Sequence, residues 1–302
     1  MNRPATGDDV EHARNVLARG GLVGLPTETV YGLAASVAHE DAIRRVFAVK
    51  GRPADHPLIV HVAHVEAARS VAGVWPVVAE RLADAFWPGP LTLLVERSNV
   101  VPDVVTGGRD TVAIRVPSKG IARELLKLLD QAVVAPSANR FGKVSPTTAA
   151  HVADDLGTDV DYILDGGPCD VGVESTIVDC TVAPPQILRP GAVTKEHIEE
   201  VIGEVATTSG PSRAPGMLES HYAPRCQILT VESIDDARRL AADRESRVID
   251  AASDPEAAAH DIYAELRACD RDGIRTAIVV LPDTRGLGAA LRDRILKAAV
   301  GR

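Results

Sequence analysis

The segment from Ala206 to Pro224 divides this chain of 302 residues into two parts of different character. It reads ATTSGPSRAPGMLESHYAP, which is rich in Ser, Thr, Gly and Pro and lacks periodicity, as is typical of a linker. The chain is also longer than one hydrophobic core usually organises. We therefore predict a larger domain over residues 1–205, a linker or lid over 206–224, and a smaller domain over 225–302.

In the larger part, apolar runs of strand length and amphipathic stretches of helix length alternate irregularly. Helices are predicted near residues 10–19, 40–49, 64–72, 76–86, 147–156 and 194–202, and strands near 22–26, 57–62, 91–96, 111–116, 133–136, 162–164, 175–179 and 186–189. Several of these strands follow each other with no helix between them. A mixed, twisted and partly antiparallel sheet with helices is therefore expected, and a pure strand–helix–strand repeat is excluded.

The smaller part has a regular alternation of strands and helices. Strands are predicted near residues 227–231, 247–250 and 276–281, with helices near 234–242 and 255–268 and a last helix after the third strand. This order favours a small three-layer α/β domain with a parallel, Rossmann-like sheet.

Composition limits the possible classes of protein. The net charge of −9 and an aromatic content of only 3% disfavour general binding to nucleic acid. No apolar run approaches the roughly 20 residues that cross a bilayer, and the N-terminus lacks the apolar core of a secretory signal, so we predict a cytoplasmic protein without a membrane segment. The four cysteines are widely separated with no CxxC, so no zinc site and no disulfide framework is predicted.

Residues 49–61 read VKGRPADHPLIVH and predict an anion site. Lys50 is a compact point charge, whereas Arg52 is a planar fork of donors that matches carboxylate or phosphate oxygens, and Pro53 stiffens the backbone behind it. His61 ends the following strand, on the face opposite Leu58. From the sequence alone, a structural histidine with satisfied hydrogen bonds is the commoner explanation for it.

Two further segments have polar residues beside strands. PTETVYG (26–32) follows a strand at the end where α/β proteins place ligands, although a capped turn leading into a helix would explain it equally well. In TVAIRVP (111–117) the period of two places Thr111, Ala113 and Arg115 on one face and the valine and isoleucine core on the other. Arg115 then faces a cavity or solvent, and a solvent-exposed arginine is the commoner case.

APSANRFGKVSPTT (135–148) predicts a strand end followed by a helix that Ser145 caps and Pro146 begins. The N-terminus of such a helix attracts phosphate, and a plain cap is the alternative. Glu174-Ser175-Thr176 and Leu188-Arg189-Pro190-Gly191 again place polar residues beside apolar strands. Standard nucleotide-binding loops and an obvious nucleophile–base pair are both absent, which favours binding and aligning phosphorylated or carboxylated substrates.

Together these motifs, in this order, resemble the YrdC-like threonylcarbamoyl-AMP synthases in their two-domain form. The resemblance extends from about residue 20 to the APGMLESHYAP motif that ends at Pro224, and also includes ILRPG (187–191). It implies a nucleotidyltransferase that forms L-threonylcarbamoyl-AMP from L-threonine, bicarbonate or CO2, and ATP, and releases pyrophosphate. The product would pass to the tRNA threonylcarbamoyl transferase machinery, and Mg²⁺ would enter with ATP, since no dedicated carboxylate cage is visible.

The resemblance also assigns roles to single residues of this chain. L-threonine would contact Thr29, His61, Arg115, the backbone of Ala135, and Ser175. ATP would contact Arg52, His56, Thr111, Ser137, Ser145, Arg189 and Tyr222. The polar cluster at the reacting centre would be Lys50, Arg52, Ser137 and Asn139, where electrostatic preorganisation would supply most of the catalysis.

Two positions depart from the family pattern. His56 stands where asparagine is common before Pro-Leu, and Phe141 replaces a small serine before glycine. A nucleotide contact by His56 would therefore be made differently from that of the family's asparagine. A different class of function, a tRNA-binding or double-stranded RNA-binding protein without adenylate synthesis, would need surplus surface Lys and Arg, which the acidic balance of the chain disfavours.

Overall fold

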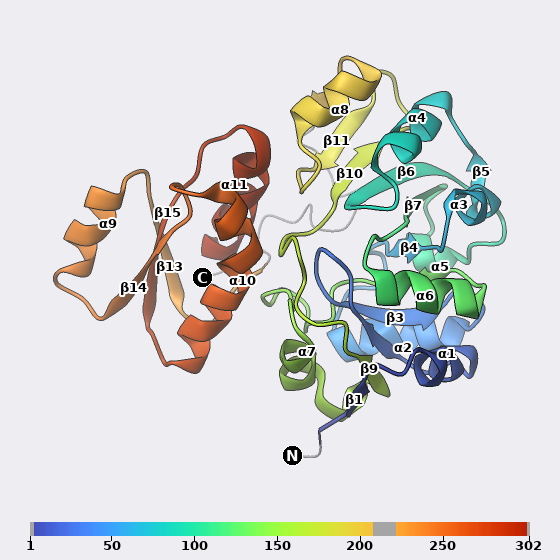
Figure 1. Ribbon diagram of the computed structural model, residues 1–302, viewed down its shortest axis with the longest axis horizontal. Coiled ribbons are helices and arrows are strands. Elements are labelled where there is room, and N and C mark those ends of the chain that lie inside the picture. Colours follow the sequence, from blue (N-terminus) through green and yellow to red (C-terminus); the bar gives the residue numbers. More distant parts are fainter. Residues whose placement is uncertain (1–2, 208–221, 301–302) are drawn as a thin grey trace.

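The computed structural model describes residues 3–207 and 222–300, which form a large mixed α/β domain and a smaller α/β domain beside it (Figure 1). Most of the predicted linker, residues 208–221, lies outside the described residues, and Ala206–Thr207 form a strand (β12) of the larger domain. Among the described residues, no helix is long and apolar enough to span a membrane.

The described part of the larger domain contains one twelve-stranded sheet in the order β1-β9-β2-β3-β8-β4-β7-β6-β10-β11-β12, with β5 paired to β6. The strands are β1 (Ala5–Gly7), β2 (Val23–Leu25), β3 (Gly32–Ser36), β4 (Ile59–His61), β5 (Ala72–Val74), β6 (Leu91–Arg97), β7 (Thr111–Arg115), β8 (Val133–Val134), β9 (Tyr162–Leu164), β10 (Thr176–Asp179), β11 (Gln186–Arg189) and β12. Parallel pairs such as β4–β7 and β6–β10 alternate with antiparallel pairs such as β6–β7 and β10–β11. The mixed sheet predicted from the sequence is confirmed.

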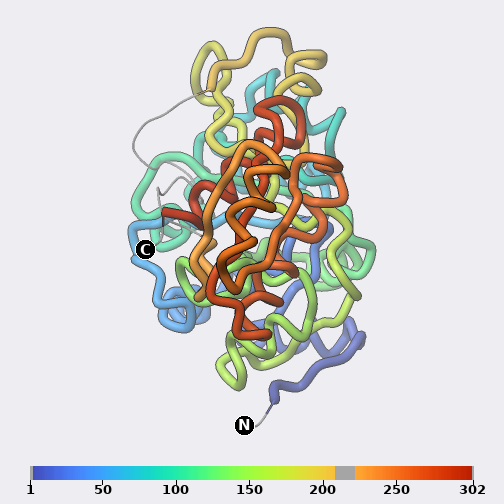
Figure 2. Tube along the Cα trace, turned by 90° about the vertical axis from the view of Figure 1, so that its left-hand side faces the viewer, coloured from blue at the N-terminus to red at the C-terminus, as the bar shows by residue number. Residues whose placement is uncertain are grey.

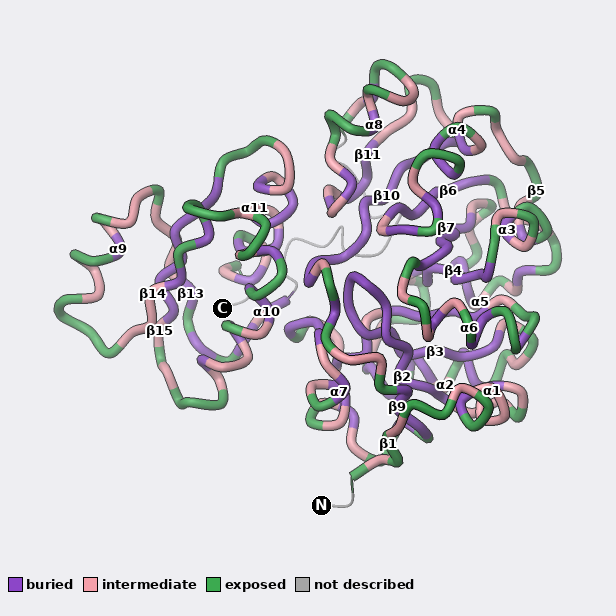
Figure 3. The backbone as a smooth tube through the Cα atoms, viewed as in Figure 1, coloured by how far each residue is buried: buried purple, intermediate pink, exposed green. Residues whose placement is uncertain are grey.

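Two sets of helices cover the two faces of this sheet. The helices are α1 (Val10–Ala18), α2 (Glu40–Lys50), α3 (Val65–Val71), α4 (Val77–Phe86), α5 (Asp103–Thr106), α6 (Gly120–Leu129), α7 (Ala149–Leu156) and α8 (Lys195–Ile202). Apolar residues of α2, α3, α4 and α7 pack with the strands in the largest core, and α1 and α6 build a second core on the other face. Figure 3 shows the strands as mostly buried backbone, with exposed segments on the outer helices and loops.

The smaller domain contains three parallel strands in the order β13-β15-β14, as the sequence predicts. Its elements are β13 (Gln227–Val231), α9 (Ile234–Ala241), β14 (Ser246–Asp250), α10 (Pro255–Arg271), β15 (Thr276–Val280) and α11 (Gly286–Ala299). Helices α10 and α11 lie on the side of this sheet that faces the larger domain, and α9 lies on the far side (Figure 1). Figure 2, viewed from the side of the smaller domain, shows its orange and red trace lying across the larger domain.

Several features of the larger domain differ from the predictions, and three of them concern helices. PTETVYG does not lead into a helix, because Leu25 and Gly32 pair across an antiparallel β2–β3 hairpin. Helix α6 was not predicted, although Ala122, Leu125, Leu126 and Leu129 lie at helical spacing and are all buried. Ser145 is not a helix cap, because Thr148 caps α7 by accepting a hydrogen bond from the His151 N–H.

Candidate active site

Most of the predicted site residues converge on one polar pocket at the ends of β4, β7 and β11. His61 and Arg115 are directly paired neighbours of the parallel strands β4 and β7, so their side chains lie on the same face. A small apolar cluster on this face lies beside them, made of Ile59, Leu94, Ala113, Ile177 and Leu188. The pocket encloses about 580 Å³ of empty space including its open mouth, and its lining is Thr27, Thr29, Val30, Gly32, Arg52, Ile59, His61, Arg115, Ala135, Pro136, Ser137, Glu174, Ser175, Arg189 and Tyr222.

Arg115 faces the pocket rather than solvent, and only 4% of it is exposed. Its Nη2 donates to Glu28 Oε1 over 2.7 Å, its Nη1 to Thr29 Oγ1 over 2.8 Å, and its Nε to the Gly89 carbonyl over 3.2 Å. Burial alone would raise the pKa of Glu28, but the charge of Arg115 and the hydrogen bonds to the carboxylate together outweigh it, and the pKa is lowered. These contacts use three of the five N–H donors of a guanidinium, which leaves two for a substrate carboxylate.

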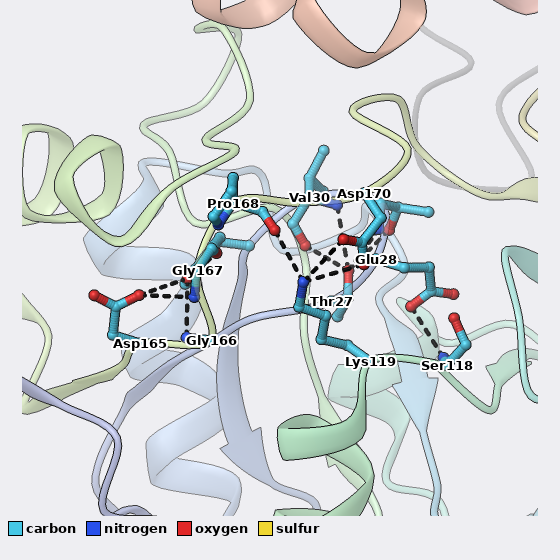
Figure 4. Close-up of polar contacts among 12 residues, drawn as sticks. Thr27, Glu28, Val30, Ser118, Lys119, Asp165, Gly166, Gly167, Pro168 and Asp170 are labelled. Carbon is cyan, nitrogen blue, oxygen red and sulfur yellow. Dashed lines mark hydrogen bonds and ion pairs between the residues drawn. The ribbon is translucent and has the colours of Figure 1, made fainter. Parts of the chain in front are cut away.

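The loop of the β2–β3 hairpin is held rigidly beside Arg115. Thr27 Oγ1 donates to the Val30 carbonyl over 2.6 Å and lies 2.9 Å from Thr29 Oγ1. Figure 4 shows Thr27 and Val30 in this loop, with the Glu28 carboxylate reaching the Ser118 N–H over 3.0 Å. The loop thus presents hydroxyl groups to the pocket without the helix that one interpretation of the sequence required.

Gly32 allows the hairpin to approach the strand end at Ala135. A Cβ placed on Gly32 would lie 2.9 Å from the Ala135 Cβ and 3.3 Å from its carbonyl oxygen. The Ala135 N–H already donates to the Ile59 carbonyl over 3.1 Å. The backbone group that Ala135 can offer a ligand is therefore its carbonyl, which is an acceptor suited to an amine.

We expect Gly32→Ala to weaken binding of L-threonine, the substrate that the family resemblance implies, because the added methyl group displaces Ala135 from its position in the pocket wall. Overpacking typically costs about 1–3 kcal/mol, and about 1.4 kcal/mol of this in binding would raise the KM for L-threonine about tenfold. Steady-state pyrophosphate release at varied L-threonine measures it. Gly120→Ala is the matched control, because no heavy atom lies within 4 Å of a Cβ placed there. Equal KM values for the two variants would contradict the role given to Gly32.

Lys50 lies behind the pocket and does not line it. Gly51 ends α2 in the left-handed conformation, at φ 63°, so that Lys50 points into the domain while Arg52 leaves the helix towards the pocket. The Lys50 ammonium donates to the carbonyl of Ser137 and, over 2.6 Å, to that of Asn139. Burial and the nearby Arg52 lower the pKa of Lys50 well below its ordinary value. Lys50 therefore holds the Ser137–Asn139 loop, and its contact with substrates stays a prediction.

Arg52 contacts both residues that depart from the family pattern. Its guanidinium carbon lies 5.9 Å from the centroid of the Phe141 ring, and the rings of His56 and Phe141 are 5.6 Å apart. Arg52 Nη2 donates to the Pro57 carbonyl over 3.0 Å. Burial and the neighbouring charge of Arg189 lower the pKa of Arg52 to about 10, so it remains charged at neutral pH. The two departures thus form one aromatic surface beside Arg52, and His56 does not line the pocket.

Arg189 and Ser175 form a further part of the pocket wall. Arg189 donates through Nε to the Ser175 carbonyl and through Nη2 to Ser175 Oγ, both over 3.0 Å. Ser145 lies behind this wall, where its Oγ donates to Glu174 Oε1 over 2.6 Å.

Nine of the predicted site residues line the pocket, and five do not. The five outside the lining are Lys50, His56, Thr111, Asn139 and Ser145. Glu28, Gly32 and Glu174 matter to the site and were not among the predicted residues. Glu28, in the PTET motif, could be expected to pair with a cation, but the sequence does not indicate with which one.

His61 gives the folded chain an acid-sensitive group. Burial and the charge of Arg115 lower the pKa of His61 to about 3. An unfolded histidine has a pKa near 6.5, so between about pH 6.5 and 3 the unfolded chain binds the extra proton and stability falls as the pH falls.

We expect His61→Asn to flatten this dependence. Between about pH 7 and 4.5 the free energy of unfolding should fall by about 2 kcal/mol less in the variant than in the parent protein. Urea unfolding at both pH values measures the difference. His260→Asn is the control because His260 is exposed on α10. An unchanged slope in His61→Asn would show that His61 is not the group that resists protonation.

Comparison with known proteins identifies the family. A family model described as telomere recombination matches residues 15–191, and a model described as the threonylcarbamoyl-AMP synthase C-terminal domain matches residues 193–300. The chain belongs to the Sua5/YciO/YrdC family, in its two-domain form. It is 41% identical to the threonylcarbamoyl-AMP synthase of Pyrococcus abyssi, over 95% of this chain and 93% of the relative. It is 38% identical to that of Bacillus subtilis, over 97% and 93%.

The fold agrees with this membership of the Sua5/YciO/YrdC family. The crystal structure of P. abyssi Sua5 complexed with L-threonine superposes with a TM-score of 0.93 at 40% identity, over 99% of this chain and 98% of that chain. Because the agreement covers both domains together, their relative arrangement is shared as well as their separate folds.

Proposed function

We propose that this chain forms L-threonylcarbamoyl-AMP from L-threonine, bicarbonate or CO2, and ATP, with release of pyrophosphate. The observation that carries the proposal is the convergence, in one pocket, of most of the residues expected for both substrates in a chain that matches threonylcarbamoyl-AMP synthases over nearly its full length. The same match favours the enzyme over an RNA-binding protein without adenylate synthesis. In reaction class the enzyme is a nucleotidyltransferase.

The reaction requires two negatively charged groups, the carbamate and the triphosphate of ATP, to come together. The threonine amine captures CO2 as a carbamate, and a carbamate oxygen attacks the α-phosphate of ATP while pyrophosphate leaves. Arg115 would hold the threonine carboxylate with its two remaining N–H groups, and the Ala135 carbonyl would accept from the amine. Arg52 and Arg189 would face the phosphates, because both line the pocket. Fixed positive charge at the reacting centre stabilises the charge that develops in the transition state.

Mg²⁺ forms part of the proposal as a companion of ATP. Among the described residues, no group of three or more His, Cys, Asp or Glu could hold a metal ion. The two carboxylates beside the pocket, Glu28 and Glu174, are each engaged by an arginine. Triphosphate oxygens and water would therefore supply the ligands. Transfer of the product to the tRNA threonylcarbamoyl transferase machinery, and with it a cytoplasmic location, belongs to the same proposal.

One assay tests the proposed reaction. The purified chain is incubated with ATP, Mg²⁺, labelled bicarbonate and single amino acids, and the labelled adenylate and pyrophosphate are measured. L-threonine should give both products, and omission of bicarbonate should abolish them. Equal product formation with serine, valine or no amino acid would overturn the assignment of the substrate.

A further inference from the structure

Arg294 of α11 connects the smaller domain to the wall of the pocket. It is only 1% exposed, and it makes two contacts with the larger domain and one with Tyr222 of the predicted linker. Nε donates to Glu174 Oε2 over 2.7 Å, Nη2 donates to the Pro190 carbonyl over 2.9 Å, and the guanidinium carbon lies 5.3 Å from the centre of the Tyr222 ring. Each contact is made to a different segment that borders the pocket.

The smaller domain supplies Glu174 with its ion-pair partner and with a further hydrogen-bond donor. Its buried carboxylate lines the pocket and accepts from Ser145 Oγ, from the Tyr263 hydroxyl of α10 over 2.8 Å, and from Arg294. Burial would raise the pKa of Glu174, but Arg294 and Arg189 lower it to about 2. Without Arg294, a poorly compensated buried carboxylate would stand beside the arginines that are to receive phosphate.

The contact with Pro190 holds the segments that carry Arg189 and Ser175. A Cβ placed on Gly191 would lie 2.3 Å from the Thr176 nitrogen and 2.5 Å from the Glu174 carbonyl oxygen, so the turn packs backbone against backbone on this strand end. Arg189 in turn donates to Ser175. Arg294 therefore contacts these neighbouring segments at two points, the Glu174 side chain and the Pro190 carbonyl.

The third contact reaches Tyr222, which follows the undescribed part of the chain. The Tyr222 ring stacks on that of Tyr263, with centroids 5.6 Å apart and planes 26° apart, and Arg294 lies over it. Tyr222 also lines the pocket. Two residues of the smaller domain therefore fix the place of an aromatic ring at the site.

We propose that Arg294 is a positioning residue of the nucleotide site, through which the smaller domain sets the pocket wall that binds ATP. The inference rests on the proposed function. It gives the smaller domain a part in the reaction without requiring any of its own residues to contact the substrate. Arg294 acts through Glu174, the Pro190 carbonyl and Tyr222.

The test compares Arg294→Met with Arg292→Met on the same helix. Arg292 pairs with Glu232 and donates to the Pro282 carbonyl, both within the smaller domain. We expect Arg294→Met to raise the KM for ATP about tenfold, and Arg292→Met to leave it within about twofold of the parent value. A merely structural role would reduce the folded fraction, which lowers the apparent kcat and leaves KM unchanged. Thermal unfolding of each variant is followed in parallel.

The charge of Glu174 supplies a second readout. The charged and titratable groups that face it are Arg294, Tyr263, Arg189 and Tyr222, with the Ser145 hydroxyl completing its contacts. In Arg294→Met, Glu174 loses the largest charge that lowers its pKa, so its pKa rises above the parent value and a fall in pH protonates the carboxylate more readily, which removes its repulsion of ATP. The ratio of the variant KM to the parent KM should therefore shrink as the pH falls. The double variant Glu174→Gln/Arg294→Met should show a similar partial recovery at every pH.

The outcomes separate the inference from the proposed function. If the parent protein releases no pyrophosphate with L-threonine, the proposed function fails before any variant is compared. If the parent is active and Arg294→Met matches Arg292→Met in KM and pH dependence, the inference alone is overturned. Should Arg294→Met not fold, Tyr263→Phe removes one donor to Glu174 and should raise the KM for ATP in the same direction, whereas an unchanged KM would overturn the inference.

Discussion

Arg52→Ala is expected to abolish L-threonine-dependent pyrophosphate release while the protein stays folded. Arg52 lines the pocket and is fixed by the Pro57 carbonyl and the Phe141 ring. Its lowered pKa of about 10 still leaves it charged at neutral pH. Removing one preorganised donor from a reacting centre typically lowers kcat about 10²- to 10³-fold, and here a full positive charge is lost as well.

The measurement is kcat by pyrophosphate release, together with circular dichroism and thermal unfolding. Arg44→Ala is the matched control, because Arg44 lies on the preceding helix α2 and pairs only with Glu40 and Asp41 of that helix in the described structure. It should retain parent activity. Turnover by Arg52→Ala within about threefold of the parent would remove Arg52 from the catalytic centre.

Much of the site could be predicted because its residues follow strands. The period of two along β7 placed Arg115 opposite the valine and isoleucine core, and His61 occupies the equivalent place on β4. Parallel pairing then brings the two side chains together at one end of the sheet. Site residues that are positioned by the ends of paired strands can therefore be predicted from a single sequence.

The partners of those residues could not be predicted. From the sequence, Arg115 could also be solvent-exposed, because Glu28, its counter-charge, is 87 positions away. Ser145 has the residue type and the following proline of a helix cap, yet its hydroxyl donates to Glu174, which is held in turn by α10 and α11. Local preference was overridden by tertiary contacts that no local pattern encodes. The same reason explains why Lys50 supports a loop instead of lining the pocket.

Glu28→Ala is expected to produce the largest loss of stability, because it leaves Arg115 buried without its carboxylate. Breaking a buried ion pair by removing one partner typically costs about 3–5 kcal/mol. Glu28 is 3% exposed and also accepts from the Ser118 N–H, so the hairpin loop loses a second tie. Urea unfolding should show the loss. The double variant Glu28→Ala/Arg115→Met should recover part of it, because no uncompensated charge then remains.

The response to L-threonine distinguishes a purely structural role of the Glu28–Arg115 ion pair from a role in binding the substrate. If Arg115 receives the threonine carboxylate, L-threonine supplies the missing negative charge in Glu28→Ala and should raise its melting temperature more than that of the parent. The double variant lacks the guanidinium, so L-threonine should leave its melting temperature unchanged even though the fold has recovered. The double variant would then recover stability without recovering the response to L-threonine. This is the result expected if Arg115 both stabilises the fold and binds the substrate. An equal rise with L-threonine in the parent and both variants would mean that the carboxylate binds elsewhere in the pocket.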